Sequence, residues 1–269
     1  PVMNHAGREQ AESHWANAKV IQIWRGVVLA SGDQISYQSA DMYSESEAST
    51  RIYLGEISGQ HYFAMNKEVL EGPTLRDISS NLSEVDLEIA VTALALINWH
   101  ETHPKCSRCG SDTEVIENGW VRKCLVDDTS HFPRTDPAII VAVQDRNGRL
   151  CLGRQSIWPE KRFSNFAGFV EPGESLEDAV VREVKEETGL DVKEVKYLFS
   201  QPWPFPNSIM LAFEAFTENP EVAKPDGLEI VNLKWFTKEE LTSQVASDEL
   251  NLPPHTTVSR KMIERWLNG

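Results

Sequence analysis

The chain has 269 residues, an apolar fraction of 41% and a formal net charge of −15, from 26 basic and 41 acidic side chains. This length predicts two domains with room for a small third module, and the acidic balance argues against a nonspecific grip on nucleic acid, which needs a basic surface. No apolar run approaches the roughly eighteen residues of a membrane-spanning helix. The first twenty residues lack a signal-peptide core, and three of the four cysteines lie close together, which indicates a metal site in a reducing compartment. We therefore expect a cytoplasmic protein that has no membrane contact.

The first part of the chain begins with strand-like sequence. Residues 21–29 and 51–65 are rich in the β-branched and aromatic side chains that strands favour. The second stretch breaks at Ser58-Gly59, which predicts a hairpin. Residues 31–50, between the two stretches, are polar and predict a loop.

A helix is expected to follow these strands. Residues 82–101 have a long apolar middle, and Ser83 is a candidate N-cap. Strands followed by one helix predict a small α+β domain over residues 1–104. The sequence of this domain alone indicates no function.

Residues 105–133 carry a cysteine knuckle. Cys106 and Cys109 are spaced C-x2-C, and Cys124 follows after fourteen residues. Asn118-Gly119 between them predicts a hairpin with a type I′ turn. A knuckle, a hairpin and a returning cysteine are the layout of a zinc ribbon, in which thiolates surround Zn²⁺ tetrahedrally.

The fourth ligand of such a ribbon departs from the expected cysteine. Asp127 occupies that position, and zinc accepts a carboxylate oxygen. We expect Asp127 to complete a structural Zn²⁺ site, with Asp128 and His131 close enough in sequence to substitute for it. The alternative is that the three cysteines are remnants of a lost site.

Residues 134–269 predict a third unit, a mixed sheet flanked by helices in an α/β/α sandwich. Cys151 lies within one predicted strand and is interpreted as a small core residue. The predicted strands are 138–143, 150–153, 195–199, 209–216 and 231–236. The predicted helices are the one that follows Ser175 and a closing amphipathic helix over 257–267.

The most informative stretch of the chain is residues 168–190. It fits the pattern G-x5-E-x7-R-E-U-x-E-E-x-G-U, where U is aliphatic, and a chance match at one starting point is roughly below one in a billion at ordinary residue frequencies. This stretch resembles the Nudix box of the Nudix hydrolases, which cleave nucleoside diphosphates linked to another group. The matching residues are Gly168, Glu174, Arg182, Glu183, Val184, Glu186, Glu187, Gly189 and Leu190.

The box also makes physical sense without the resemblance. Ser175 is a plausible N-cap, and Gly189 would end the helix. Glu183 and Glu187 are four residues apart and fall inside the apolar stripe, with Glu186 beside them. A hard divalent cation with oxygen ligands would remove the repulsion among the three carboxylates. The alternative is an ordinary solvated acidic face.

A second motif, residues 200–208, indicates the substrate class. Its prolines alternate with Trp203 and Phe205, so a stiff segment presents rings that stack well on bases. Read alone, it would be an exposed proline-rich loop or a partner ligand. After the box, SQPWPFPNS resembles the S-Q-P-W-P-F-P-x-S signature of the NADH pyrophosphatases, a branch of the Nudix hydrolases that is close to the decapping enzymes for NAD-capped RNA.

This resemblance implies that NADH and NAD are cleaved to AMP and to reduced or oxidised nicotinamide mononucleotide. It implies two or three Mg²⁺ or Mn²⁺ ions and a homodimer. Either Glu187 or Glu229 would be the general base. The implied ligands of these ions are Glu174, Glu183, Glu186, Glu187 and Glu229.

The resemblance also implies residues that contact the dinucleotide. Arg76 would reach the site from the first domain. The alternatives in function are the decapping of NAD-capped RNA by the same chemistry and a catalytically silent module that binds nicotinamide nucleotides. The implied substrate-binding residues are Phe132, Ala167, Phe169, Gln201, Pro202, Trp203, Pro204, Phe205, Pro206, Asn207, Ser208, Ser259 and Arg76.

Overall fold

The structure is a computed structural model that describes residues 2–269. The chain forms two compact units. One runs to Thr135 and also includes Trp203–Asn207, and the other comprises Asp136–Pro202 and Ser208–Gly269. The finer division of the first unit into residues 1–104 and 105–133 stays a prediction. Within residues 2–269, no helix has the length and apolar character needed to cross a membrane.

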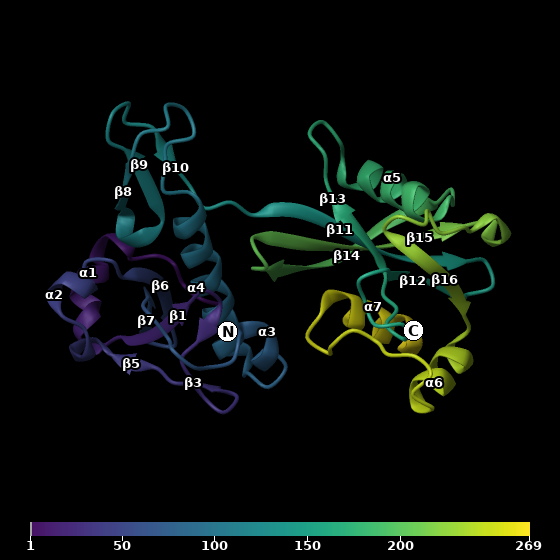
Figure 1. Ribbon diagram of the computed structural model, residues 1–269, viewed down its shortest axis with the longest axis horizontal. Helices are drawn as coiled ribbons and strands as arrows, with labels where there is room; N and C mark the ends of the chain where they lie inside the picture. Colours follow the sequence, from purple (N-terminus) through teal and green to yellow (C-terminus); the bar gives the residue numbers. More distant parts are fainter. Residues whose placement is uncertain (1) are drawn as a thin grey trace. The chain divides into compact units, whose positions relative to one another are not determined.

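The first unit contains a five-stranded sheet in the order β2-β1-β7-β6, with β5 paired to β1 (Figure 1). Strands β1 and β7 are parallel, whereas β6 and β7 form the antiparallel hairpin predicted at Ser58-Gly59. The helices are α1 (Ala11–His14), α2 (Glu45–Ala48), α3 (Leu75–Ile78) and α4 (Glu84–Thr102), with short 3-10 helices at Arg8–Gln10, Trp15–Asn17, Ala40–Met42 and Glu117–Gly119. The strands are β1 (Lys19–Trp24), β2 (Val27–Val28), β3 (Ala30–Ser31), β4 (Gln34–Ile35), β5 (Gln38–Ser39), β6 (Ile52–Ile57), β7 (Gln60–Asn66), β8 (Thr113–Ile116), β9 (Val121–Cys124) and β10 (Ser130–His131).

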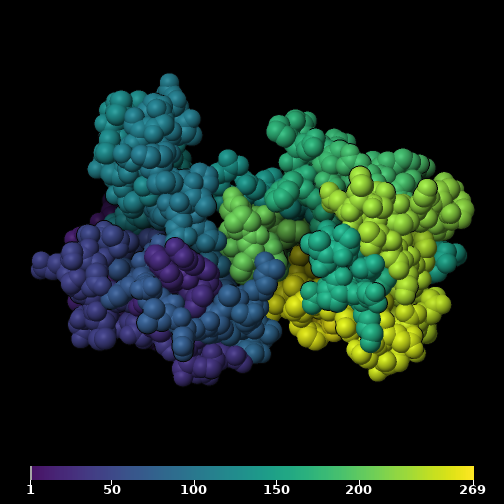
Figure 2. All heavy atoms as spheres, viewed as in Figure 1, coloured from purple at the N-terminus to yellow at the C-terminus, as the bar shows by residue number. Residues whose placement is uncertain are grey.

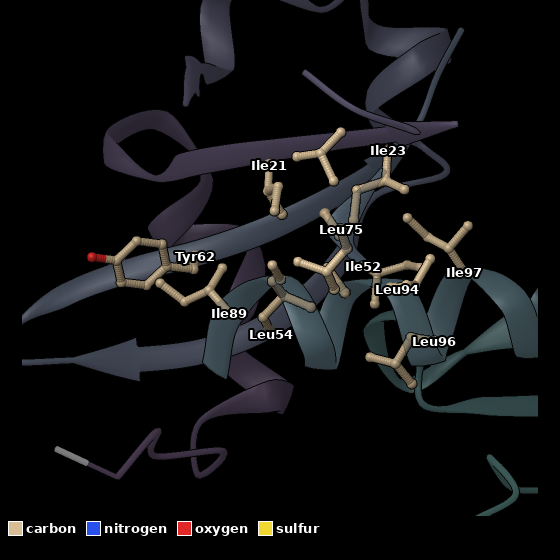
Figure 3. Packing of buried hydrophobic residues seen from close by; sticks show 14 of the residues in the cluster. Ile21, Ile23, Ile52, Leu54, Tyr62, Leu75, Ile89, Leu94, Leu96 and Ile97 are labelled. Carbon is tan, nitrogen blue, oxygen red and sulfur yellow. The ribbon is translucent and has the colours of Figure 1, made fainter. Parts of the chain in front are cut away.

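Helix α4 packs on this sheet and forms the larger of two cores of the first unit with it; the other includes Val20, Tyr53 and Phe63. The helix begins after Ser83, whose hydroxyl accepts the N–H of Asp86 at 3.1 Å, as the sequence predicted. Its apolar middle faces the sheet and α3 (Figure 3). Each such buried aliphatic side chain contributes about 1.5–3 kcal/mol. The side chains labelled in Figure 3 are Ile21, Ile23, Ile52, Leu54, Tyr62, Leu75, Ile89, Leu94, Leu96 and Ile97.

Two expectations for this unit are wrong. The stretch 21–29 is not one strand, because Arg25 and Gly26 adopt φ values of 50° and 81° and turn the chain from β1 into β2. The predicted loop 31–50 contains short elements, namely part of β3 together with β4, β5, the 3-10 helix Ala40–Met42 and α2. Elements of two to four residues are too short for a periodic apolar pattern to reveal them.

The cysteine-bearing segment is a three-stranded sheet in the order β10-β9-β8. It forms a lobe at one side of the first unit (Figure 2). At the predicted turn, Asn118 and Gly119 have φ values of 50° and 98°, and the Trp120 N–H donates to the Glu117 carbonyl at 3.3 Å. Positive φ at both central residues is the mark of a type I′ turn, so this prediction is confirmed. Strand β10 was not predicted.

The second unit is built on a six-stranded mixed sheet in the order β14-β15-β11-β12-β16, with β13 paired to β11. Strand β11 runs parallel to β15 and antiparallel to β12 and β13. The strands are β11 (Asp136–Asp145), β12 (Leu150–Gln155), β13 (Phe166–Phe169), β14 (Lys193–Trp203), β15 (Ser208–Thr217) and β16 (Ile230–Phe236). The helices are α5 (Leu176–Thr188), α6 (Lys238–Ala246) and α7 (Val258–Asn268), with a 3-10 helix at Pro220–Val222.

Strand β11 is buried on both faces, and its alternating side chains build two cores. Ile139 and Val141 pack with the inner face of α5, in the core that also contains Cys151. Ile140 and Ala142 pack with residues of α6 and α7. Because successive side chains of a strand point to opposite faces, α5 covers one face of the sheet and α6 and α7 cover the other. The predicted sandwich is therefore confirmed, although β13 and α6 were not predicted.

Candidate active site and a cysteine cluster

Helix α5 carries most of the predicted acidic site, and its ends are fixed as the sequence predicted. The Ser175 hydroxyl accepts the N–H of Asp178 at 3.1 Å. Gly189 has a φ of 70° and donates its N–H to the Lys185 carbonyl at 2.9 Å. Ala179, Val180 and Val184 are buried against the sheet. The helix is therefore held at both ends and along its apolar face, so its carboxylates have defined positions.

Glu187 is the most unusual side chain of this helix. It is only 3% exposed, and neither of its carboxylate oxygens has a hydrogen-bond partner among the residues described by the structure. Burial, together with the charges of Glu183, Glu229 and Asp226, raises its pKa to about 8. A buried carboxylate without a partner is costly unless something else supplies a positive charge or a proton.

Glu183 lies one helical turn before Glu187, against the backbone of β13. Its carboxylate occupies the space where a Cβ on Gly168 would lie. Burial raises the pKa of Glu183, although the hydrogen bond from Arg182 acts in the opposite direction. Gly168, the first glycine of the box, is therefore needed because any larger residue would place its Cβ where the Glu183 carboxylate lies.

Arg182 connects the other carboxylates of the box. Its guanidinium donates to Glu174 at 2.5 and 3.0 Å, and to Glu183 and Glu186 at 2.9 Å each. It also donates to the Phe169 carbonyl at 2.9 Å. The bond from Arg182 lowers the pKa of Glu174 and raises that of Arg182 itself. Arg182 thus orients three carboxylates and ties α5 to β13.

Asp226 is a residue of this site that the sequence reasoning missed. Its carboxylate accepts the N–H groups of Glu229 and Ile230 at 3.0 and 2.7 Å, and its own N–H donates to the Glu187 carbonyl at 3.2 Å. Burial acts to raise the pKa of Asp226, but these backbone N–H groups outweigh it, so the pKa is lowered. The Asp226-Gly227 pair is a turn signal that would have revealed this loop.

Glu183, Glu186, Glu187 and Glu229 form an acidic cluster that fits a divalent cation. Its donors are carboxylate oxygens, which Mg²⁺ and Mn²⁺ prefer, and the two orphaned oxygens of Glu187 lie among the charges of Glu183, Glu186 and Glu229. The acidic oxygens are spread more widely than the atoms of a closed metal site. Within residues 2–269, the one group of three or more ligand atoms that all lie within 4.8 Å of one another is formed by the cysteine cluster.

That cluster consists of Cys106, Cys109, Cys124 and Asp127. The sulfurs of Cys109 and Cys124 lie 3.5 Å apart, and the Cys106 sulfur lies 3.9 Å from both Asp127 oxygens. Backbone N–H groups donate to the Cys124 sulfur at 3.4 Å. Four soft and hard donors at these distances fit a tetrahedral ion such as Zn²⁺.

The structure also distinguishes the three candidates for the fourth ligand of this cluster. Asp127 joins the cysteines, and the thiol of Cys124 and the Thr129 groups hold the pKa of its carboxyl well below the usual range. Asp128 instead pairs with Lys123 at 2.9 Å, and His131 lies in β10, outside the group.

The rings of the second motif lie together. The Trp203 and Phe205 centroids are 5.1 Å apart at an interplanar angle of 72°. The guanidinium of Arg76 lies 4.6 Å from the Phe205 centroid and 5.7 Å from that of Trp203. Such stacking of a cation on rings stabilises the arrangement by about 0.5–1 kcal/mol at exposed sites. The structure therefore brings the predicted arginine to the predicted aromatic pair.

The flanks of this motif have separate positions. Gln201 donates to the Thr256 carbonyl at 2.7 Å, and Ser208 is buried at the start of β15, beside Asp136. The first part of the predicted stiff segment is a strand, because residues 200–203 continue β14. Pro204–Asn207 form the turn that follows.

The remaining predicted contacts have mixed environments. Phe132 and Phe169 are exposed by 65% and 59%, so their rings are accessible. Ala167 packs against the core on the α7 side of the sheet. Ser259 is buried, and its hydroxyl lies 2.8 Å from the Ser164 hydroxyl and accepts two bonds from Asn165. The side chain of Ser259 therefore joins α7 to the segment before β13.

Comparison with known proteins agrees with this geometry. Residues 134–265 match the family described as NUDIX domain. An NAD-capped RNA hydrolase NudC from Mycobacterium bovis is 34% identical over 278 residues, which cover 96% of this chain and 88% of that protein. The chain belongs to the NUDIX family. The resemblance predicted from the box is thereby confirmed, and this Nudix protein is a hydrolase by its family.

Other Nudix proteins match over shorter stretches. The human NAD-capped RNA hydrolase NUDT12 is 35% identical over 198 residues, covering 69% of this chain and 43% of that protein. The crystal structure of a NUDIX hydrolase from Nitrosomonas europaea covers 61% of this chain and 90% of its own, with 19% identity and a TM-score of 0.49.

Proposed function

We propose that this Nudix hydrolase cleaves the pyrophosphate bond of NADH and NAD, releasing AMP and reduced or oxidised nicotinamide mononucleotide. The observation that carries the proposal is the buried Glu187 carboxylate, which has no hydrogen-bond partner among the described residues and lies among other acidic side chains. The nicotinamide substrate is supported by the SQPWPFPNS segment and by relatives whose names describe hydrolysis of NAD-capped RNA.

In the proposed mechanism, Glu183, Glu186, Glu187 and Glu229 would hold Mg²⁺ or Mn²⁺, with Glu174 as an auxiliary ligand. When bound, these cations would neutralise negative charge on the phosphate oxygens. Arg182 orients the carboxylates through its bonds to Glu174, Glu183 and Glu186. The proton of the attacking water passes to a carboxylate oxygen of Glu187 or Glu229.

The dinucleotide would contact the aromatic rings of the chain. In our proposal, Trp203 and Phe205 stack on its bases. The two rings contact each other edge to face, and Arg76 lies over Phe205, so the group combines aromatic surface with a positive charge. We call these three side chains the aromatic platform. Phe132 and Phe169 offer further exposed rings. The other proposed contacts are Ala167, Gln201, Pro202, Pro204, Pro206, Asn207, Ser208 and Ser259.

The deciding experiment is the release of AMP from NADH with and without Mg²⁺, using Glu187→Gln as the control. Wild type should release AMP only with the cation, and the variant should lose on the order of 10² or more in kcat, because it retains shape but loses a charge. If the protein leaves NADH intact but rapidly cleaves another nucleoside diphosphate derivative, NADH is not its substrate. Binding of NADH without cleavage would indicate a silent binding module.

A second candidate substrate is NAD-capped RNA, favoured by the names of the relatives. Both substrates present the same pyrophosphate to the same carboxylates. Comparing kcat/KM for NADH and for a short NAD-capped RNA at two salt concentrations separates them, because phosphate contacts make RNA binding salt-dependent.

We further propose that the cysteine cluster holds structural Zn²⁺ and that residues 105–133 are a separate module. Free thiols at Cys106, Cys109 and Cys124 suit a reducing compartment such as the cytoplasm. A homodimer is proposed from the family resemblance alone. Light scattering of the purified protein tests it, and a monomeric mass at assay concentration would exclude the dimer.

A further inference from the structure

The turn that carries Phe205 is short of hydrogen-bond donors. Pro202, Pro204 and Pro206 have no N–H group, so this stretch has more backbone acceptors than backbone donors. Carbonyls in such a segment must find donors elsewhere in the protein or in water. A side chain that supplies those donors would fix the turn.

Asn98, in the last turns of α4, supplies them. Its side-chain amide donates to the Pro204 carbonyl at 3.2 Å and to the Pro206 carbonyl at 3.3 Å. An amide NH₂ has two hydrogens, so one group can serve both acceptors. The two carbonyls belong to the Pro204–Phe205 and Pro206–Asn207 peptide units, so their restraint fixes the chain before and after Phe205.

The Phe205 ring is held from other sides as well. It packs against the core of the first unit, lies edge to face with Trp203 and stacks with Arg76. These contacts hold the ring at a given place only if the backbone beneath it is fixed. The side-chain donors of Asn98 reach that backbone before and after Phe205.

The end of α4 is a rigid support for Asn98. His100 is two residues further along the helix. Its Nε2 atom lies 2.8 Å from the Gly119 carbonyl oxygen, and its Nδ1 atom lies 3.0 Å from the Arg122 guanidinium. Burial lowers the pKa of His100 to about 4, so its neutral ring donates to Gly119 and accepts from Arg122. The Thr102 hydroxyl donates to the Asn98 carbonyl at 2.6 Å.

We propose that Asn98 is a positioning residue for substrate specificity: its amide holds the Pro204–Pro206 turn so that Phe205 and Trp203 are set for the rings of the dinucleotide. The inference rests on the proposed function and extends it to a residue outside both sequence motifs. Because Asn98 acts on the aromatic platform and not on the acidic cluster, it affects substrate affinity and leaves the chemical step unchanged.

The test is a set of variants at position 98, assayed with NADH at saturating Mg²⁺. Asn98→Asp keeps the shape but has no donor, and Asn98→Ala removes the group. Both should raise KM about tenfold, the order expected for two lost hydrogen bonds, with kcat within about twofold of wild type. Asn98→Gln keeps both donors on a side chain that is one methylene longer, and it should recover part of the affinity. The matched control is Thr92→Ala, which removes a hydroxyl bonded to the Glu88 carbonyl on the same helix and should leave KM unchanged.

A second measurement separates this inference from the proposed function. NADH is titrated calorimetrically into Glu187→Gln protein with and without Asn98→Asp, the variant that keeps the shape but lacks the donors, so that binding is read without turnover. A raised Kd supports the inference. Equal Kd and KM values in folded variants would overturn it while the proposed function stands. If wild type neither binds nor cleaves NADH, the proposed function is wrong. The aromatic platform that Asn98 positions would then not bind this dinucleotide.

Discussion

The carboxylate of Glu183 lies so close to the α-carbon of Gly168 that no Cβ fits between them. Gly168 belongs to β13 and pairs with Ile139 of the central strand, so the glycine cannot easily move away. The first residue of the box and one of its acidic residues, fifteen positions apart in the sequence, are thus one steric unit.

We expect Gly168→Ala to displace the Glu183 carboxylate. Overpacking of this kind costs about 1–3 kcal/mol of stability, and a shifted ligand should raise the Mg²⁺ concentration needed for half-maximal activity. Chemical denaturation and a Mg²⁺ titration of activity check both effects. Gly173→Ala is the spatial control, because no atom lies within 4 Å of its added Cβ, although the φ of 93° adds backbone strain. An unchanged Mg²⁺ requirement in Gly168→Ala would contradict the expectation.

Glu187 should make the stability of chelator-treated protein depend on pH. Its pKa is raised from 4.5 to about 8 by burial, so the native state keeps a proton that the unfolded chain releases. This contribution to the free energy of unfolding is fully present below a pH of about 4.5 and is lost as the pH rises through about 8. Its size is on the order of a few kcal/mol. Urea unfolding at a pH of about 6 and of about 9 measures the loss, and Glu187→Gln should flatten it. If the free energy of unfolding changes equally with pH in wild type and in Glu187→Gln, the pH dependence does not come from Glu187.

Trp203→Ala should raise KM for NADH by about 5- to 150-fold, since stacking on a base contributes about 1–3 kcal/mol. The apparent affinity for Mg²⁺ should stay within about twofold, because the acidic side chains belong to other elements. Steady-state kinetics at several Mg²⁺ concentrations check both values. Trp266→Phe, in α7, is a comparison that replaces a buried tryptophan outside the motif. If KM for NADH does not change, Trp203 has no stacking role.

The cysteine cluster should contain about one equivalent of zinc in protein purified without chelator. Asp127→Cys should slow the loss of zinc to a chelator, because a thiolate binds zinc more tightly than one carboxylate oxygen does, and Asp127→Ala should speed it. Asp128→Asn is the matched control, since Asp128 pairs with Lys123 instead. Metal analysis and chelator kinetics provide the measurements. Zinc below about a tenth of an equivalent would identify the cysteines as remnants.

Local features of this protein were readable from the sequence, whereas long-range contacts were predicted only where the family resemblance supplied them, as for Arg76 and the aromatic pair. The ends of α5 at Ser175 and Gly189 follow from capping chemistry within a few residues, so the box helix was predicted correctly. Strand β13 escaped prediction because Gly168 and the exposed Phe169 break its apolar pattern. Asp226 escaped because its role depends on the N–H groups of a loop that folds back to Glu187.

The same distinction applies to the aromatic motif. Its rings and prolines are evident in the sequence, but Asn98 lies 106 residues before Pro204, and no periodic pattern connects them. The strand Lys193–Trp203 was predicted too short, as residues 195–199, because proline lacks the N–H that a paired strand needs and the motif from residue 200 onward was interpreted as a separate stiff segment. Pairing in the folded sheet thus overrode the local preference at the start of the motif.

The place of residues 203–207 has a consequence for how this chain can be divided. These residues pack within the first unit, yet they are synthesised after more than half of the second. A fragment that ends at residue 135 would lack Phe205 and would expose the apolar surface that this ring covers. The first unit is therefore not continuous in sequence, and a fragment that ends at residue 135 is an incomplete version of it. A fragment supplemented with a peptide covering the turn would be the smallest complete version of it.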